Sequence, residues 1–201
     1  MRLPFLTAAL AALSFALPAV AQKVQVFGGT GPRAASTLIL FGDNLAGGMS
    51  VTHGDPAWKP EYDGMLDKVK GKLNRLGKDW WTTFTTTVDL EIGGTMVPAG
   101  AYLVGLDCSA EGKFGLAFLE ATKGMKQGAL PFALPPQNEM NWKPDFIAPL
   151  QLNKDASETV VEKMKIELTS DKEDRSKGTF TIAWGKHTLT GAMQLHLHQA
   201  K

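Results

Sequence analysis

An alternation of apolar and polar positions over residues 80–92 is the clearest structural signal in the chain. The alternate positions that we expect on a buried face are Trp80, Phe84, Val88, Leu90 and Ile92. The positions between them carry Trp81, Thr83, Thr85, Thr87, Asp89 and Glu91. A period of two with this composition predicts one long, half-buried β-strand. Turn residues follow at 93–94 and 98–100, so residues 101–106 are predicted to return as its hairpin partner.

Shorter segments of the same character recur along the chain. We expect strands at 37–41, 49–53, 113–120, 160–168, 179–184 and 189–198. Apolar residues at helical spacing predict one short amphipathic helix near 61–70. Residues 121–149 contain five prolines and are predicted to form a long loop, because proline breaks regular elements. About 8–9 mostly antiparallel strands predict an all-β, single-domain β-sandwich.

The N-terminal 21 residues have the pattern of a secretory signal peptide. Arg2 is followed by an uncharged apolar run that ends in Ala19-Val20-Ala21, which is a signal-peptidase type of site. Pro4 and Pro18 leave an apolar helix shorter than the ~20 residues that a membrane span needs. We therefore expect removal of residues 1–21, a single domain over 22–201, and a periplasmic or secreted location.

Charge and cysteine content narrow the classes of partner. The chain has 21 Lys and Arg and 20 Asp and Glu, so removal of Arg2 leaves a formally neutral mature chain with 20 of each sign. Neutrality without long charge blocks argues against nucleic acid as a partner. The segment after residue 21 contains no apolar run long enough to span a membrane. The single cysteine, Cys108, is expected to be buried as a small hydrophobe.

No motif in the sequence indicates a cofactor or a known catalytic apparatus. Gly29, Gly31 and Ala34 have the spacing of a dinucleotide-binding fingerprint. However, Pro32 lies where the phosphate-binding helix should begin, and residues 36–41 read as a strand where that helix is required. A flexible glycine-rich loop is the better interpretation. Nucleophile-elbow, zinc-protease and phosphate-loop motifs are absent from the sequence. We predict no cofactor.

The densest cluster of polar and aromatic side chains lies at the end of the 49–53 strand. It contains His53, Asp55, Trp58 and Tyr62. A His and an Asp two residues apart could share a metal ion or a proton. Asp55-Pro56 is also an ordinary turn-forming pair, and that structural interpretation is favoured.

Two further groups are weighed as binding sites. Trp81 with its neighbouring threonines could form a strip that stacks on a glycan, although packing against another layer is favoured. His196 and His198 share one strand face and could bind zinc or copper together with His187. His187 has the opposite strand parity, so a solvated strand edge is favoured and no metal ligand is predicted. Trp80 and Trp184 are interpreted as core residues.

Several blocks of residues resemble a bacterial family called domain of unknown function 2911. They include Val51-x-His-Gly-Asp-Pro, Arg75-Leu-Gly-Lys-x-Trp-Trp-Thr, Val88-x-Leu-x-Ile-Gly-Gly, Pro98-Ala-Gly-x-Tyr and Phe180-x-Ile-x-Trp-Gly. The resemblance covers about residues 48–197 and implies an extracytoplasmic β-rich domain, but no activity. The chain departs from the family pattern at Asp55, where many members have Arg beside the proline, and after Trp81. A polar site built on those family residues is not carried over.

The sequence therefore predicts an exported β-rich module that binds a ligand or a partner without chemistry. The partner would be a small ligand, a glycan or an envelope protein, with His53, Asp55, Trp58, Tyr62 and Trp81 as candidate contacts. Two alternatives remain open. One is a hydrolytic or metal-dependent enzyme that uses His53 and Asp55. The other is a structural envelope component whose proline-rich loop makes the contacts.

Overall fold

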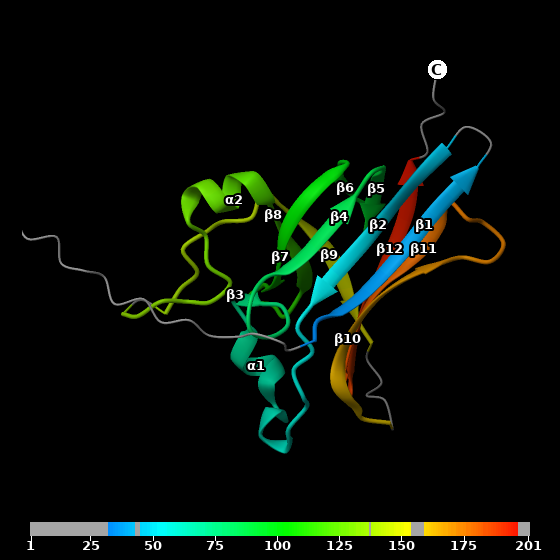
Figure 1. Ribbon diagram of the computed structural model, residues 1–201. Helices are drawn as coiled ribbons and strands as arrows, with labels where there is room; N and C mark the ends of the chain where they lie inside the picture. Colours follow the sequence, from blue (N-terminus) through cyan, green and yellow to red (C-terminus); the bar gives the residue numbers. More distant parts are fainter. Residues whose placement is uncertain (1–31, 43–44, 137, 154–158, 197–201) are drawn as a thin grey trace, which may run out of the picture. The chain divides into compact units, whose positions relative to one another are not determined.

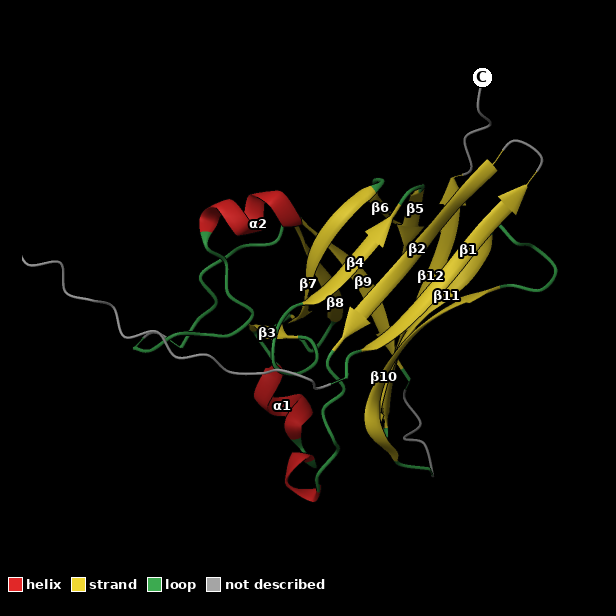
Figure 2. Ribbon diagram, in the orientation of Figure 1, coloured by secondary structure: helices red, strands yellow, loops and turns green. Residues whose placement is uncertain are grey.

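Antiparallel strands connected in one curled sheet make up most of the structure, which confirms the all-β prediction (Figures 1 and 2). The computed structural model describes residues 32–42, 45–136, 138–153 and 159–196, and all of them belong to one compact unit. The predicted signal peptide lies outside the described residues. Figure 2 shows two short helical regions beside the sheet.

The described ranges contain more strands than predicted. The sequence pattern joined β4 and β5 into one strand and gave no strand at β3 or β6. Their bounds are β1 Ala34–Gly42, β2 Leu45–His53, β3 Lys72–Arg75, β4 Thr82–Thr86, β5 Asp89–Ile92, β6 Thr95–Val97, β7 Gly100–Cys108, β8 Phe114–Glu120, β9 Phe146–Leu152, β10 Val161–Ser170, β11 Lys177–Gly185 and β12 His187–His196. The hydrogen-bonded order is β1-β2-β4-β7-β8-β9-β12-β11-β10. β3 pairs with β7, and β5 pairs with β12 and β6.

The sheet curls until its first and last strands face each other. β1 and β10 are the two ends of the hydrogen-bonded order, yet the Leu168 amide on β10 donates to Ser36 Oγ on β1 at 2.9 Å. This side-chain contact spans a seam where a closed barrel would have a backbone ladder. The sheet is therefore nearly closed, and its concave face holds the core.

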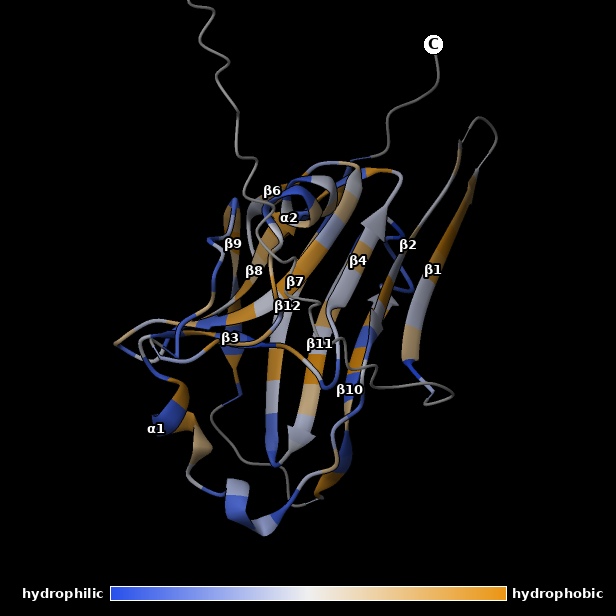
Figure 3. Cartoon of the chain, turned by 60° about the vertical axis from the view of Figure 1, so that its left-hand side comes forward, coloured by the Kyte–Doolittle hydropathy of each residue, from blue (hydrophilic) through white to orange (hydrophobic). Residues whose placement is uncertain are grey.

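Alternating apolar residues from all sides of the sheet fill this core. Figure 3 shows hydrophobic bands in orange along β10, β11 and β12, separated by white or blue bands of more polar residues. Phe84, Phe118 and Phe180 are fully buried, and Phe84 contacts both of the other rings edge-on. Cys108 is 1% exposed, as predicted. A smaller cluster outside the sheet contains Trp81, Leu103, Leu119 and Trp142.

The prediction of one long strand over 80–92 is wrong, because the chain changes neighbours within it. β4 pairs with β2 and β7, whereas β5 crosses to pair with β12. At the break, Thr86 Oγ1 donates to the Val88 carbonyl at 2.6 Å and accepts from the Val88 amide at 3.2 Å. This buried hydroxyl satisfies backbone groups that leave the ladder. The pairing of β4 with the strand after residue 100 is confirmed.

The single helix predicted near 61–70 is two elements. A 3-10 turn, η1, spans Pro60–Tyr62 and α1 spans Met65–Val69. Gly64 at φ 78° and Gly71 at φ 68° lie on either side of α1. The left-handed Gly64 precedes the first residue of α1, and the extended backbone of Lys70 ends it, so α1 has only five residues.

The segment 121–149 is only partly a loop. A helix, α2, spans Ala121–Gln127, and the Glu120 carboxylate accepts the amides of Thr122 and Lys123 at its N-terminus. Gly128 ends the helix at φ 64°. Residues 146–149 belong to β9, so the proline-rich loop proper is 128–145. The prolines misled the prediction because they cluster after α2 rather than within it.

Gly185 joins β11 to β12 beneath the indole of Trp58. Its φ is 61°, and a Cβ at this position would overlap the Trp58 ring atoms Cδ2, Cε2 and Cε3. The tight turn and the packing of Trp58 therefore both require glycine here.

Gly185→Ala is expected to lower the free energy of unfolding by more than the cost of placing an alanine at a positive φ. A left-handed alanine costs about 1–2 kcal/mol, and displacement of Trp58 adds to this cost. Gly94→Ala is the matched control, because Gly94 has φ 82° and a Cβ added there would have nothing within 4 Å. Urea unfolding should show the larger loss for Gly185→Ala, and equal losses would contradict the contact with Trp58.

Candidate functional site

Residues 53–62, from the end of β2 through the following loop to η1, contain four of the sequence-predicted site residues, and the loop is bonded to the opposite end of the sheet. The Pro56 carbonyl accepts the Met164 amide at 3.1 Å and Trp184 Nε1 at 2.9 Å. The Trp58 amide donates to the Glu162 carbonyl at 2.6 Å. These bonds attach the loop to β10 and β11, so Trp58 is held in one place by backbone contacts.

Trp58 is the centre of an aromatic cluster drawn from four elements. Its ring centroid lies 5.1 Å from that of Trp184 and 5.8 Å from that of Tyr62, both edge-on. The His187 ring is 5.9 Å away, and Tyr62 also contacts Trp184 at 5.2 Å. The loop, η1, β11 and β12 each contribute one ring. Sequence reasoning linked Trp58 with Tyr62 but assigned Trp184 to the core, where the structure makes it half-buried.

His53 is a buried residue beneath this loop, not an open catalytic group. It is 1% exposed, and its Nδ1 lies 3.1 Å from the Gly54 carbonyl. Burial lowers the pKa of His53, and the Arg33 charge acts in the same direction. The hydrogen bond with Gly54 and the charge of Asp55 oppose this shift without cancelling it. The neutral imidazole is therefore the favoured form in the folded state.

Asp55 is half-buried between two lysines. Its carboxylate lies 3.5 Å from Lys78 Nζ and 3.6 Å from Lys163 Nζ. Desolvation raises the pKa of Asp55, but its own backbone amide and the two lysine charges outweigh this effect and lower the pKa. Asp55 thus links β10 to the segment after β3, which favours the structural interpretation of the Asp-Pro turn.

Trp81 does not present an open face to a sugar. It is 4% exposed and packs edge-on against Trp142, with ring centroids 5.1 Å apart. Trp80, interpreted from the sequence as core, is 53% exposed. The alternation failed here because both tryptophans precede the first residue of β4, so strand parity does not govern them.

The histidines of β12 do not converge. His187 and His196 are the first and last residues of the strand, which places them about 30 Å apart at ~3.3 Å per residue. His187 contacts Trp58, and His196 Nε2 lies 3.0 Å from Glu91 Oε1. His198 lies outside the described residues. Among the side chains of the described ranges, no three His, Cys, Asp or Glu groups are placed to share a metal ion.

An apolar cavity of about 60 Å³ lies inside the sheet next to the aromatic cluster. Met65, Leu66 and Val69 of α1 cover it, and Trp184 and His187 line it. Its other walls are Leu76, Leu106, Phe114, Leu152, Met164, Ile182 and Leu189. A hollow of about 420 Å³ on the outer side shares Leu66, Phe114, Leu152 and His187 with this cavity. The two spaces therefore adjoin at these four side chains.

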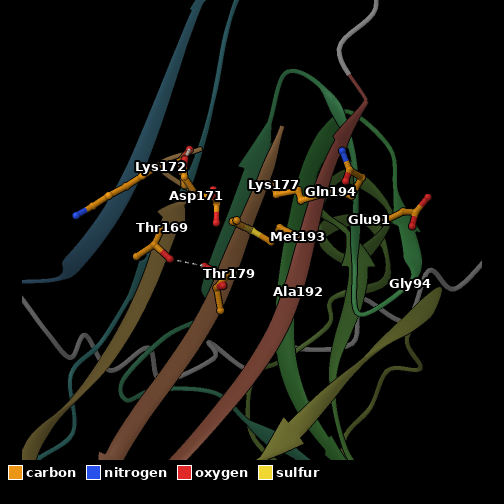
Figure 4. A pocket seen from close by; sticks show the side chains of 12 residues that line it. Glu91, Gly94, Thr169, Asp171, Lys172, Lys177, Thr179, Ala192, Met193 and Gln194 are labelled. Atoms are coloured by element: carbon orange, nitrogen blue, oxygen red, sulfur yellow. Dashed lines mark hydrogen bonds between the residues drawn. The ribbon is translucent and has the colours of Figure 1, made fainter. Parts of the chain in front are cut away.

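A larger groove of about 600 Å³ lies at the other end of β11 and β12 (Figure 4). Three of its four charged side chains, those of Glu91, Asp171 and Lys177, have partners within the protein. Lys177 pairs with Asp174 at 2.9 Å, Glu91 contacts His196, and Asp171 accepts the Glu173 and Asp174 amides. Lys172 points away from the other labelled side chains in Figure 4. This groove is a weaker candidate, because its lining is mostly polar and charged, whereas the cavity next to the aromatic cluster is apolar.

Comparison with known proteins adds no relative. No family model, no curated protein and no solved structure matches the chain. Within the described ranges, no helix has the length and apolar character needed to cross a membrane.

The neutral His53 is expected to make stability depend on pH. Because its pKa is lowered from 6.5 in the folded state, the unfolded chain binds more protons as the pH falls below that value. The free energy of unfolding should decline there by at most about 1.4 kcal/mol per pH unit from this group. His53→Gln should remove that part of the decline between about pH 7.5 and 5, as measured by urea unfolding. His196→Gln is the control and should keep the decline; an unchanged slope in His53→Gln would contradict this role.

Proposed function

We propose that the protein is an exported binding module that holds a small amphipathic ligand without chemistry. The observation that carries the proposal is the apolar cavity beneath α1, bordered by Trp184 and His187. Ligand sites in proteins are mostly apolar, with a few polar groups at one side. The signal-peptide pattern at residues 1–21 supports export, and the resemblance to an extracytoplasmic family agrees with it.

The cavity is small as it stands, so ligand entry requires α1 to move. A volume of 60 Å³ corresponds to about two water molecules, and apolar cavities stay dry. A benzene-sized group needs about 150 Å³. Displacement of the α1 side chains would join the cavity to the adjacent hollow of about 420 Å³. The combined space is within the range of ordinary small-molecule sites.

α1 is suited to such a displacement. It has five residues, none of them fully buried, and no side chain caps its N-terminus. A helix this short has little stability of its own. The flanking residues Gly64 and Gly71 can absorb backbone rotation at low steric cost.

The outer hollow provides the polar end of the site. Lys70 and Asp67 form an ion pair at 2.7 Å, and Glu111 accepts the Ser109 hydroxyl at 2.8 Å. Asp67, Lys70 and Glu111 are exposed, and they line the same hollow as His187. A ligand could therefore place an apolar part in the cavity and a polar group among the charged side chains of the outer hollow.

The alternative of an enzyme that works through His53 and Asp55 has weaker support. His53 is enclosed, and Asp55 is occupied by Lys78 and Lys163. Neither residue lines the apolar cavity. The other alternative is a structural component of the cell envelope, whose proline-rich loop 128–145 would contact other envelope proteins.

Melting of the mature chain with medium-chain fatty acids, alcohols and amines tests the proposal. A ligand at about 100 times its dissociation constant adds about 2.7 kcal/mol, which corresponds to a rise of roughly 5–10 °C. Leu152→Trp should fill the passage between the two spaces and abolish the rise. Ile147→Trp, on the same strand but 41% exposed, should leave it unchanged.

The pattern across the panel separates the possibilities. A rise with amphiphiles that Leu152→Trp removes and Ile147→Trp keeps supports the cavity site. A flat panel, or a rise that both variants retain, would overturn it. A separate assay with a medium-chain ester covers the enzyme alternative, which turnover that is lost in His53→Gln would favour.

A further inference from the structure

A second surface, independent of the cavity, lies between β3 and the proline-rich loop. This β3 groove has a volume of about 860 Å³. One wall is formed by Gly71, Lys72, Leu73, Asn74 and Arg75, and the other by Phe132, Ala133, Asn138, Glu139, Met140, Trp142, Lys143 and Pro144. It is larger than the other described hollows and shares no residue with the apolar cavity.

Positive charge dominates the groove. Lys72, Arg75 and Lys143 line it, against the single carboxylate of Glu139. All three cations are exposed, and none forms an ion pair with a described residue. Six lysines elsewhere in the described ranges have carboxylate partners and six have none, so it is the grouping of three unpaired cations in one groove that distinguishes this surface. Three unpaired cations on two facing walls favour an anionic partner.

Exposed aromatic side chains continue the groove on one side. Phe132 lines it and is 37% exposed, and Trp80 contacts Phe132 edge-on with centroids 6.4 Å apart. The residue before Trp80, Asp79, has a positive φ of 65°, a conformation that aspartate adopts more readily than most non-glycine residues. Tryptophan, phenylalanine and arginine are the residue types enriched at protein interfaces.

The base of the groove contains an unsatisfied donor. Trp142 is 5% exposed, and its indole Nε1 is enclosed without an acceptor among the described residues. Its benzene edge lies against Gly105 of β7, where an added Cβ would be 3.0 Å from Cη2. Buried indole N–H groups ordinarily have a partner.

We propose that the β3 groove docks an acidic, extended segment of a partner polypeptide. Its carboxylates would pair with Lys72, Arg75 and Lys143, and its apolar side chains would contact Phe132 and Trp80. A small inorganic anion would satisfy the cations but leave the aromatic side chains exposed. A polypeptide segment that carries both kinds of side chain matches both features of the surface.

Fluorescence polarisation with a labelled peptide of alternating Glu and Val, about ten residues long, tests this docking. The wild-type mature chain should bind it, and binding should weaken as salt is raised. Arg75→Glu should weaken binding about tenfold, because reversal of an exposed charge replaces attraction by repulsion. Phe132→Ala should weaken it too. Lys165→Glu, an exposed charge reversal on β10, is the matched control and should bind as the wild type does.

The outcomes decide the proposal without reference to the cavity. A peptide of alternating Lys and Val should not bind, and equal binding would overturn the electrostatic argument. The absence of binding up to about 1 mM, or equal losses in Arg75→Glu and Lys165→Glu, would overturn the docking site. A loss in Arg75→Glu with no loss in Phe132→Ala would reduce the surface to a site for anions only. Leu152→Trp should bind the peptide normally, which separates this surface from the ligand cavity.

Discussion

Burial of one apolar face by a single sheet that curls onto itself is the constraint on which the rest of the structure depends. The strands have alternating faces, so a flat sheet would leave one hydrophobic surface exposed. Curling brings β1 against β10, where Ser36 accepts the Leu168 amide in place of a backbone ladder. The crossing of the chain at Thr86–Val88 adds β5 beside β12 and brings Leu90 and Ile92 into the same core.

The candidate ligand site follows from how one end of this curled sheet is filled. Hydrogen bonds of the Pro56 and Trp58 backbone attach the loop after β2 to β10 and β11. The Trp58 ring lies over Gly185, at the turn between β11 and β12. Side chains from the strands do not fill this end completely, and a short helix completes the enclosure. The apolar cavity is therefore a consequence of closing the sheet with α1 rather than with another strand.

The two proposed surfaces differ in the physical source of their binding energy. The cavity would act through removal of apolar surface from water, which is largely independent of salt and pH. The β3 groove combines unpaired cations with exposed rings, so its affinity would depend on ionic strength. A module with both could hold a small molecule while it contacts a partner chain, because the two sets of lining residues do not overlap.

The sequence by itself determined the all-β class, the burial of Cys108 and the grouping of Trp58 with Tyr62. These depend on local alternation and on neighbours along the chain, which sequence patterns report directly. Tertiary structure alone decided that 80–92 divides between two sides of the sheet, that Trp81 is buried while Trp80 is exposed, and that Trp184 and His187 join Trp58. Those outcomes depend on contacts between residues more than a hundred positions apart or on where a strand begins, and neither is encoded in a local period.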